Sequence, residues 1–349
     1  MGRKAKIEQI RQMTRSHPWN SSDPKDLQQY FDSDIQTGTS KFDKACRAAI
    51  DKVVTSIQND PSILNSKVVK GGSLGKGTMV KDISDTDLVV FMNEPALGPV
   101  AKSGPNGYQE QLDEVLKRLE ANAKKLAGVT NIKRKKYLLS FTIQVRGRSQ
   151  GLPRSVDVDL VPTADNISSF SGDSSHMFNK MQQSSPGARE YYSPSLVEDQ
   201  REFVKKQPTA VKSLIRMVKV WADQCLPESL RKSYPLELLT IHMWERAGSP
   251  KSFKLERGFR CVIAILPYLH NQLKPVYWNH SKNQARTAIR AMTNPIVLDP
   301  ANPTNNVFKL YHDPVNKKDL ARASSMTLGD STLMRTVGQV QRDRTNWDD

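Results

Sequence analysis

The spacing of apolar residues predicts that helices and strands alternate through the first half of the chain. Phe141, Ile143 and Val145 fall at every second position, as in a strand with one buried face. Leu112 and Leu119 belong to a longer series with helical spacing. The expected elements are helices over 42–58 and 108–127 and strands over 87–92, around 132, over 138–145 and over 155–161.

Beyond Pro162 the apolar spacing becomes almost entirely helical. Ser195 and Glu198 form a capping-box pattern that opens a helix, and Pro208 stands where another helix can start. Helices are expected over 195–206, 208–225, 236–244 and 259–269. The order predicts an α+β protein of two lobes, with a mixed sheet in the first and helices in the second.

The change of pattern sets the expected boundaries. We expect a sheet lobe over 1–162, a helical lobe over 163–330 and a flexible tail over 331–349. A cleft between two lobes is the usual place for a ligand. The segment 93–106, rich in proline and glycine, is expected to form a surface loop.

The net charge of the chain indicates which class of partner it could bind. The chain has 52 Lys and Arg against 36 Asp and Glu, a formal net charge of +16. Such a surplus favours a polyanion, because phosphates release counterions when basic side chains bind them. A basic surface that serves only solubility is the alternative.

Cysteines and termini exclude several classes. Cys46, Cys225 and Cys261 lie far apart and form no C-x-x-C pair, so we expect three buried thiols rather than a zinc site or disulfide framework. No apolar run is long enough for a bilayer, and the first residues fit neither a secretory signal nor a myristoylation pattern. We expect a cytoplasmic protein without a membrane partner, with the nucleus as the alternative location; the oligomeric state stays open.

The candidate chemistry rests on three acidic residues. Asp85 and Asp87 lie two apart in an expected strand and therefore share a face, and Asp159 lies in a second acidic strand. Carboxylates so placed hold hard cations such as Mg²⁺. The preceding Gly72-Ser73 turn lets backbone N–H groups approach phosphate oxygens. Together these features predict phosphoryl transfer at a pair of Mg²⁺ ions, with Mn²⁺ as the alternative ion.

A basic helix face follows later in the chain. Lys212, Arg216 and Lys219 share one face of the expected helix over 208–225. On spacing alone, a solvated basic face is the alternative to a phosphate-binding one.

These motifs resemble those of the 2'-5'-oligoadenylate synthetase family, which belongs to the polymerase-β-like nucleotidyltransferases. The resemblance covers about residues 25 to 322 and rests on segments 67–78, 84–91, 159–165, 207–221, 236–246 and 296–304. It implies the polymerase-β-like fold, ATP or another nucleoside triphosphate as substrate, and double-stranded RNA as activator.

The resemblance also implies roles for individual residues. Asp85, Asp87 and Asp159 match the metal-binding triad. Residues matching nucleotide contacts are Gly72, Ser73, Lys76, Arg216, Lys219 and Tyr234. Residues matching contacts to double-stranded RNA are Lys70, Arg201, Lys205 and Thr209.

The expected product is 2'-5'-linked oligoadenylate, with release of pyrophosphate. A cyclic dinucleotide, as made by the related cyclic GMP–AMP synthase-like receptors, is the alternative, because both reactions use one metal site. Ser233 stands where vertebrate members often have a Gln that contacts adenine, so base choice stays open. The third hypothesis is an RNA-binding protein with an inactive transferase core. The presence of Asp85, Asp87 and Asp159 argues against it.

Overall fold

The computed structural model describes residues 19, 24–80, 83, 86–145, 154–170, 174–329, 336 and 347 of the chain. Two compact units are found: Thr39–Lys205 forms one, and Met1–Gly38 with Lys206–Asp349 forms the other. The division therefore differs from the expected one near residue 162. Segment 163–205 belongs to the unit with the sheet, and the N-terminal residues belong to the helical unit. Within the described residues, no helix combines the length and apolarity needed to cross a membrane.

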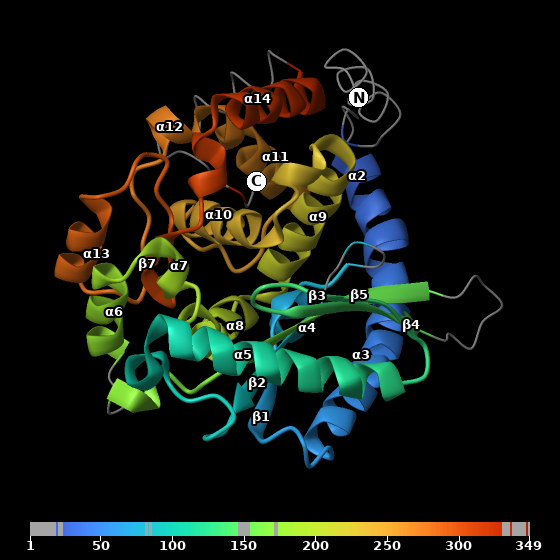
Figure 1. Cartoon of the computed structure of the whole chain (residues 1–349). Helices are drawn as coiled ribbons and strands as arrows, with labels where there is room; N and C mark the ends of the chain where they lie inside the picture. Colours follow the sequence, from blue (N-terminus) through green and yellow to red (C-terminus); the bar gives the residue numbers. More distant parts are fainter. Residues whose placement is uncertain are drawn as a thin grey trace. The chain divides into compact units, whose positions relative to one another are not determined.

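A mixed five-stranded sheet forms the centre of the first unit, in the order β1-β2-β5-β4-β3 (Figure 1). The strands are β1 (Asn65–Lys70), β2 (Thr86–Met92), β3 (Val129–Arg134), β4 (Leu139–Val145) and β5 (Arg154–Thr163). β2 and β5 run parallel, and the other pairs are antiparallel. The strands expected from sequence are confirmed, and their pairing brings the two acidic strands side by side.

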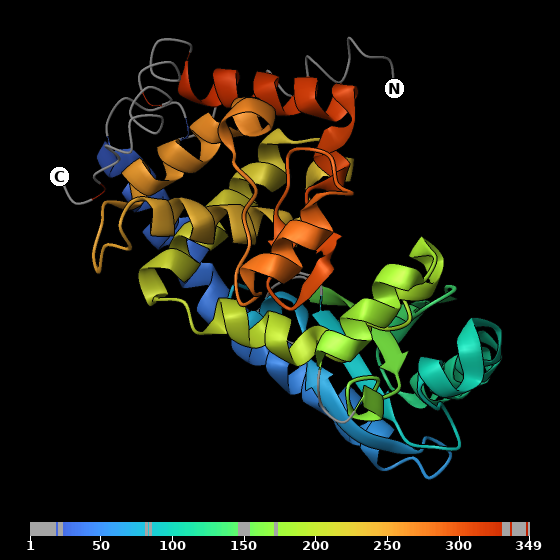
Figure 2. The ribbon, with the colours of Figure 1, turned by 90° about the vertical axis from the view of Figure 1, so that its left-hand side faces the viewer.

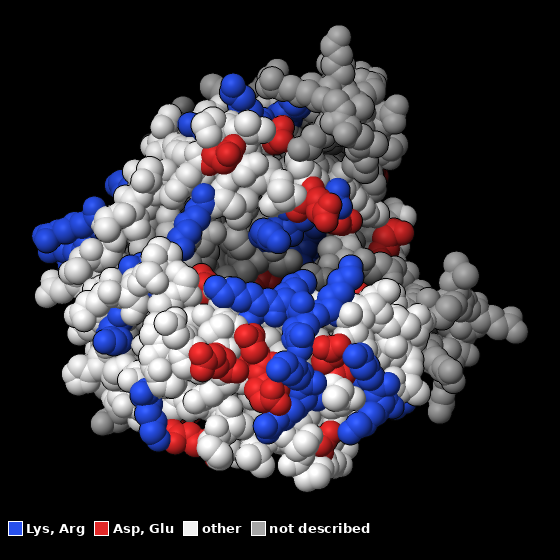
Figure 3. All heavy atoms as spheres, viewed as in Figure 1, with Lys and Arg blue, Asp and Glu red and all other residues white. Residues whose placement is uncertain are grey.

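Helices α3 (Thr37–Gln58) and α5 (Val100–Lys125) cover one face of this sheet (Figures 1 and 2). The Ser56 hydroxyl of α3 donates to Asn122 Oδ1 of α5 at 3.2 Å. The outer side of α5 shows basic and acidic side chains intermixed (Figure 3). Gly104, at φ 68°, breaks the helical geometry near the start of α5. Helical turns thus begin at Val100, inside the segment expected to be a loop.

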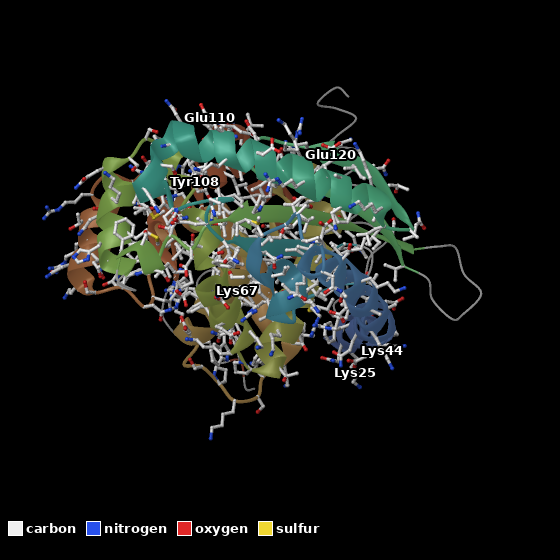
Figure 4. The ribbon with its side chains drawn as sticks, turned by 60° about the horizontal axis from the view of Figure 1, so that its bottom comes forward. Lys25, Lys44, Lys67, Tyr108, Glu110 and Glu120 are labelled. Carbon is white, nitrogen blue, oxygen red and sulfur yellow. The ribbon has the colours of Figure 1, made fainter. Side chains whose placement is uncertain are left out.

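The opposite face is covered by a helix over β1 and β2. Val197 opens α8 (Val197–Lys205) and packs with Val69, Val89 and Phe91. Lys67, whose ammonium lies 4.5 Å from the Phe91 ring centroid, is on this side of the sheet, away from α5 (Figure 4). This face carries the polar side chains of the candidate site, so we call it the polar face.

Buried polar contacts hold segment 163–205 together and join it to the start of α5. Asn166 accepts from Val100 N–H at 2.9 Å and donates to Ser195 Oγ at 2.9 Å. Ser195 Oγ in turn donates to Ala164 O at 3.1 Å. The expected capping box at Ser195 is therefore wrong: its hydroxyl serves this network, and Ser193–Leu196 is a 3-10 turn before α8. α6 (Ser174–Gln183) and α7 (Pro186–Arg189) complete the segment.

The second unit is almost entirely helical. Its longer helices are α2 (Pro24–Tyr30), α9 (Thr209–Cys225), α10 (Ser233–Arg246), α11 (Leu255–Ile265), α13 (Lys282–Ile289) and α14 (Pro314–Leu328). A short ribbon pairs β6 (Leu298–Asp299) with β7 (Asn302–Asn306). α14 lies alongside α11 (Figure 2).

Tryptophans at both ends of the chain join this unit. The Trp19 indole N–H donates to Gln224 Oε1 at 2.8 Å, and its ring stacks on Phe259 at 5.1 Å. Trp347 is buried, 1% exposed, against Phe253, and its carbonyl accepts from Lys254 N–H at 3.1 Å. Of the flexible tail expected over 331–349, the structure describes only residues 336 and 347; the rest of that prediction lies outside the described residues.

Candidate active site

Two of the three predicted carboxylates stand directly beside each other. Asp87 of β2 and Asp159 of β5 are register partners in the parallel pair. Asp159 is in turn opposite Ser140 of β4, whose hydroxyl donates a hydrogen bond to Asp159 Oδ1. Residues in lateral register share a face of a sheet. Asp87, Asp159 and Ser140 therefore form one row across three strands on the polar face.

A glycine turn lies against this row. Gly71 N–H donates to Asp87 O at 2.8 Å, which fixes the end of β1 beside the start of β2. At Gly72, φ is 53°, and a Cβ there would lie 2.6 Å from Asp87 Oδ2. Both the backbone conformation and the close approach require glycine. The turn therefore packs the Gly72 main chain directly against the Asp87 carboxylate.

The short helix α4 (Gly72–Lys76) continues the turn. Ser73 and Lys76, both predicted nucleotide contacts, are 7% and 8% exposed. The first N–H groups of a helix have no acceptor within it, so the Gly72-Ser73 segment has donors suited to phosphate oxygens. Gly77, at φ 75°, ends the helix, and Thr78 N–H donates to Ser73 O at 3.0 Å.

Asp85 lies outside the described residues. Among the residues that are described, no group of three His, Cys, Asp or Glu side chains is arranged to hold a metal ion. Asp87 and Asp159 nevertheless supply two hard carboxylate donors on one face at one register position, which suits Mg²⁺ or Mn²⁺. Asp157, on the same face, accepts from the Thr142 hydroxyl at 2.7 Å.

The remaining predicted nucleotide contacts belong to the helical unit. Lys219 of α9 is buried, 3% exposed, and Arg216 is half-buried one turn before it. A buried lysine head group is costly without polar partners, so the basic face of α9 is more than a solvated surface.

Tyr234, near the start of α10, is held by a buried carboxylate. Its hydroxyl donates to Asp299 Oδ1 at 2.9 Å, and Ala301 N–H donates to the same oxygen at 2.9 Å. Burial, with the nearby Asp299 charge adding to it, raises the pKa of Tyr234 well above its ordinary value. The phenol therefore stays protonated, and its ring orientation is fixed from the β6–β7 ribbon.

The predicted RNA contacts divide between the units. Arg201 and Lys205 of α8 and Lys70 of β1 belong to the sheet unit, and Thr209 begins α9 in the other unit. Arg201 Cδ lies 3.1 Å from the position of a Cβ on Gly75, so this basic residue packs against α4. Lys70 forms an ion pair with Asp51 of α3.

A carboxylate accompanies the basic pair on α8. Glu202 Oε1 accepts from Arg201 Nε at 3.1 Å and from Lys205 Nζ at 3.3 Å. The hydrogen bond from Lys205, with its charge and that of Arg201, lowers the pKa of Glu202. The basic pair is thus partly neutralised in the chain alone.

The three cysteines are buried free thiols, as expected. Burial raises the pKa of Cys225 to about 12 and of Cys261 to about 11. Both stay as thiols at neutral pH, which removes them from nucleophilic roles.

Sequence reasoning missed two supporting residues. Ser140 orients Asp159, and Asp299 orients Tyr234. For Ser140 a signal exists, because Ser140, Thr142 and Gln144 alternate with the apolar positions of β4. Asp299 is 65 residues from Tyr234, and nothing in the local pattern links them.

Solved structures share the fold of this chain. CdnC from E. coli MS115-1 with ATP superposes with a TM-score of 0.52 at 17% identity, over 94% of this chain and 99% of that one. Terminal uridylyl transferase 4 from Trypanosoma brucei with bound GTP gives 0.52 at 14% identity, over 97% and 99%. The expected polymerase-β-like nucleotidyltransferase fold is thereby confirmed.

Family models and curated relatives give a narrower assignment. A nucleotidyltransferase domain model matches residues 50–146, and the C-terminal domain model of 2'-5'-oligoadenylate synthetase 1 matches 172–343. Rat 2'-5'-oligoadenylate synthase 1A is 32% identical over 270 residues, 69% of this chain and 71% of that protein. The mouse 1A protein is 33% identical over 270 residues, covering 69% of each.

A longer relative is matched only in part. Rat 2'-5'-oligoadenylate synthase 3 is 35% identical over 260 residues, and this match spans 22% of its length. The acidic row, the glycine turn beside it and these matches agree, and the chain belongs to the 2'-5'-oligoadenylate synthase family of nucleotidyltransferases.

Proposed function

We propose that the chain joins ATP into 2'-5'-linked oligoadenylate, releases pyrophosphate, and does so in response to double-stranded RNA. The observation that carries the chemistry is the row of Asp87 and Asp159 beside Gly72, where an added Cβ would lie 2.6 Å from Asp87 Oδ2. The relatives' names supply the product, 2'-5'-oligoadenylate.

Asp87 and Asp159, with Asp85, would hold two divalent ions. Bound there, the ions would supply charge neutralisation at the transferred phosphate and acidify the attacking hydroxyl. The chain's own contribution is orientation. Ser140 occupies Asp159 Oδ1, and within the described residues Oδ2 has no partner, so that oxygen is left for the reaction centre.

The donor triphosphate is assigned to the Gly72-Ser73 turn and the basic side chains Lys76, Arg216 and Lys219. In the reaction, a 2'-hydroxyl oxygen of the acceptor bonds to the α-phosphorus of the donor as the bond to the pyrophosphate oxygen breaks. Tyr234, fixed by Asp299, is assigned to the donor base.

Product analysis tests the chemistry. The protein is incubated with all four nucleoside triphosphates and Mg²⁺, with and without double-stranded RNA, and products are identified by mass spectrometry. We expect a ladder of adenylates that a 3'-5'-specific nuclease leaves intact. A single cyclic dinucleotide would instead favour the alternative, which the relatives' names do not support.

Asp159→Asn tests the acidic row. We expect the rate of product formation to fall about 1,000-fold or more, because several kcal/mol of charge stabilisation is removed. Asp157→Asn is the matched control, on the same strand and face, and should retain most activity. Equal losses in the two variants, or none in Asp159→Asn, would contradict the assignment.

For the activator, we propose that RNA phosphates and 2'-hydroxyls contact Arg201 and Lys205, with Lys70 and Thr209. Two basic residues one helical turn apart suit the minor groove of double-stranded RNA, where recognition is by shape. Reversing both charges, Arg201→Glu with Lys205→Glu, should abolish stimulation by RNA and leave basal activity. Stimulation at the unaltered level would remove this surface from the proposal. We also propose that the protein is cytoplasmic, with the nucleus as the alternative location.

A further inference from the structure

We propose that Lys133 binds a phosphate of the acceptor strand, the oligonucleotide whose 2'-hydroxyl attacks the donor. This inference rests on the proposed function and deepens it. It assigns the acceptor to the side of the acidic row that faces β4 and β3.

Lys133 is the next member of the acidic row. Ser140, opposite Asp159 in β4, is also opposite Lys133 in β3. The row thus runs Asp87, Asp159, Ser140, Lys133, one residue from each of four neighbouring strands, on the polar face. At a strand spacing of about 4.8 Å, the Lys133 Cα is about 10 Å from that of Asp159.

A bulge in β3 puts Lys133 on this face. Thr130 is opposite Thr142 and Lys133 is opposite Ser140, so three steps along β3 match two along β4. Strict alternation from Thr130 would place Arg134, and not Lys133, beside Thr130 on the polar face. Asn131, at φ 56°, provides the left-handed residue inside the bulge, which asparagine tolerates. Bulges beside active sites commonly re-aim one side chain.

Charge pairing separates the basic residues of the hairpin by face. Arg134 Nη1 lies 3.7 Å from Glu120 Oε2 of α5, and the Lys136 ammonium lies 4.9 Å from the Tyr137 ring centroid, with Asp113 of α5 nearby. Lys133 is exposed and has no acidic or hydrogen-bonding partner within the described residues. Arg134, on the α5 side, thus has an acidic partner, whereas Lys133 on the polar face, like Lys135 in the hairpin turn, has none within the described residues.

The direction of the reaction explains why an acceptor would meet this cation. The glycine turn assigned to the triphosphate follows β1 and lies on the β1 side of Asp87. Attacking and leaving oxygens are roughly in line in phosphoryl transfer. The acceptor therefore approaches from the opposite side, over β5 and β4, and its backbone extends towards Lys133.

The test measures binding of a fluorescent 2'-5'-linked triadenylate by anisotropy at several salt concentrations. In Lys133→Ala we expect about fivefold weaker binding, and a salt dependence of log K shallower by about 0.7, the value of one lost phosphate contact on a single strand. Lys133→Arg should restore both. The KM for the triadenylate as primer should rise in Lys133→Ala while kcat holds.

Arg134→Ala and Lys136→Ala are matched controls, each removing one positive charge from the same hairpin. Both should bind as the unaltered protein does. Equal weakening in all three variants, binding unchanged in Lys133→Ala, or no triadenylate binding by the unaltered protein would each overturn the proposal. Mass spectrometry of products distinguishes failure of this proposal from failure of the proposed function. If adenylates are made but triadenylate binding is unchanged in Lys133→Ala, only the acceptor contact is contradicted. If triadenylate binding depends on Lys133 but no adenylates are made, only the synthase activity is contradicted.

Discussion

At the scale of single residues, the site depends on contacts that leave no space for added atoms. Gly72 is the clearest position, because both its positive φ and its distance to Asp87 exclude a side chain. Ser140 and Asp299 constrain the site differently: each orients one functional side chain, Asp159 and Tyr234 respectively, by a hydrogen bond. The chemistry is therefore sensitive to changes of one methyl group.

Gly72→Ala should reduce kcat/KM about 100-fold, because a carboxylate displaced by about 1 Å is no longer aligned with substrate. Gly104→Ala is the control: Gly104 also has a positive φ, 68°, but its Cβ would meet nothing within 4 Å. Both variants should also lose about 1–3 kcal/mol of stability from backbone strain. Steady-state kinetics and thermal melting check this; a large activity loss in both would show that strain alone matters.

At the scale of elements, α8 and the β3–β4 hairpin both present basic residues, but they neutralise them differently. On α8 the basic pair shares Glu202, whereas in the hairpin the bulge separates paired from unpaired cations. Glu202 therefore competes with any polyanion that binds Arg201 and Lys205.

Glu202→Gln should tighten double-stranded RNA binding about threefold at moderate salt, because exposed ion pairs that compete with RNA are weak but not negligible. Glu114→Gln on α5 is the matched control, since Glu114 also lies beside two cations, Lys117 and Arg118, but away from the proposed surface. RNA titrations at several salt concentrations measure both. Weaker binding in Glu202→Gln would indicate that Glu202 orients the basic pair rather than competing.

At the scale of the whole molecule, folding stability should depend on pH through a half-buried histidine, His242. Burial, with the nearby Arg246 charge adding to it, lowers the pKa of His242 to about 4 from its ordinary 6.5. The folded state binds the proton less well than the unfolded state, so stability is full above pH 6.5 and is lost as pH falls towards 4. The loss amounts to at most about 3 kcal/mol.

Urea unfolding at pH 6.5 and pH 4.5 checks this. His242→Gln should make the unfolding free energy less dependent on pH across that interval, and His176→Gln, at an exposed position, should leave the dependence unchanged. A steep dependence that persists in His242→Gln would assign it to other groups.

The sequence by itself determined the local parts. Alternating and helical apolar spacing identified β2, β3, β4 and β5, with α3 and α9, since burial of one face imposes those periods; β1 was not expected. The Gly72 turn and the aspartates of β2 and β5 were visible because close approach and metal binding demand particular residue types. Ser195 shows the limit: a valid capping pattern yielded to a buried network with Asn166 and Ala164.

Only the tertiary structure decided which of these parts meet. Parallel pairing of β2 with β5 put Asp87 beside Asp159, and a one-residue bulge turned Lys133 onto their face. Trp19 and Trp347, at opposite ends of the chain, joined one helical unit. Such outcomes depend on contacts between residues far apart in sequence, whose energies no local period records, and so they follow from packing of the whole chain.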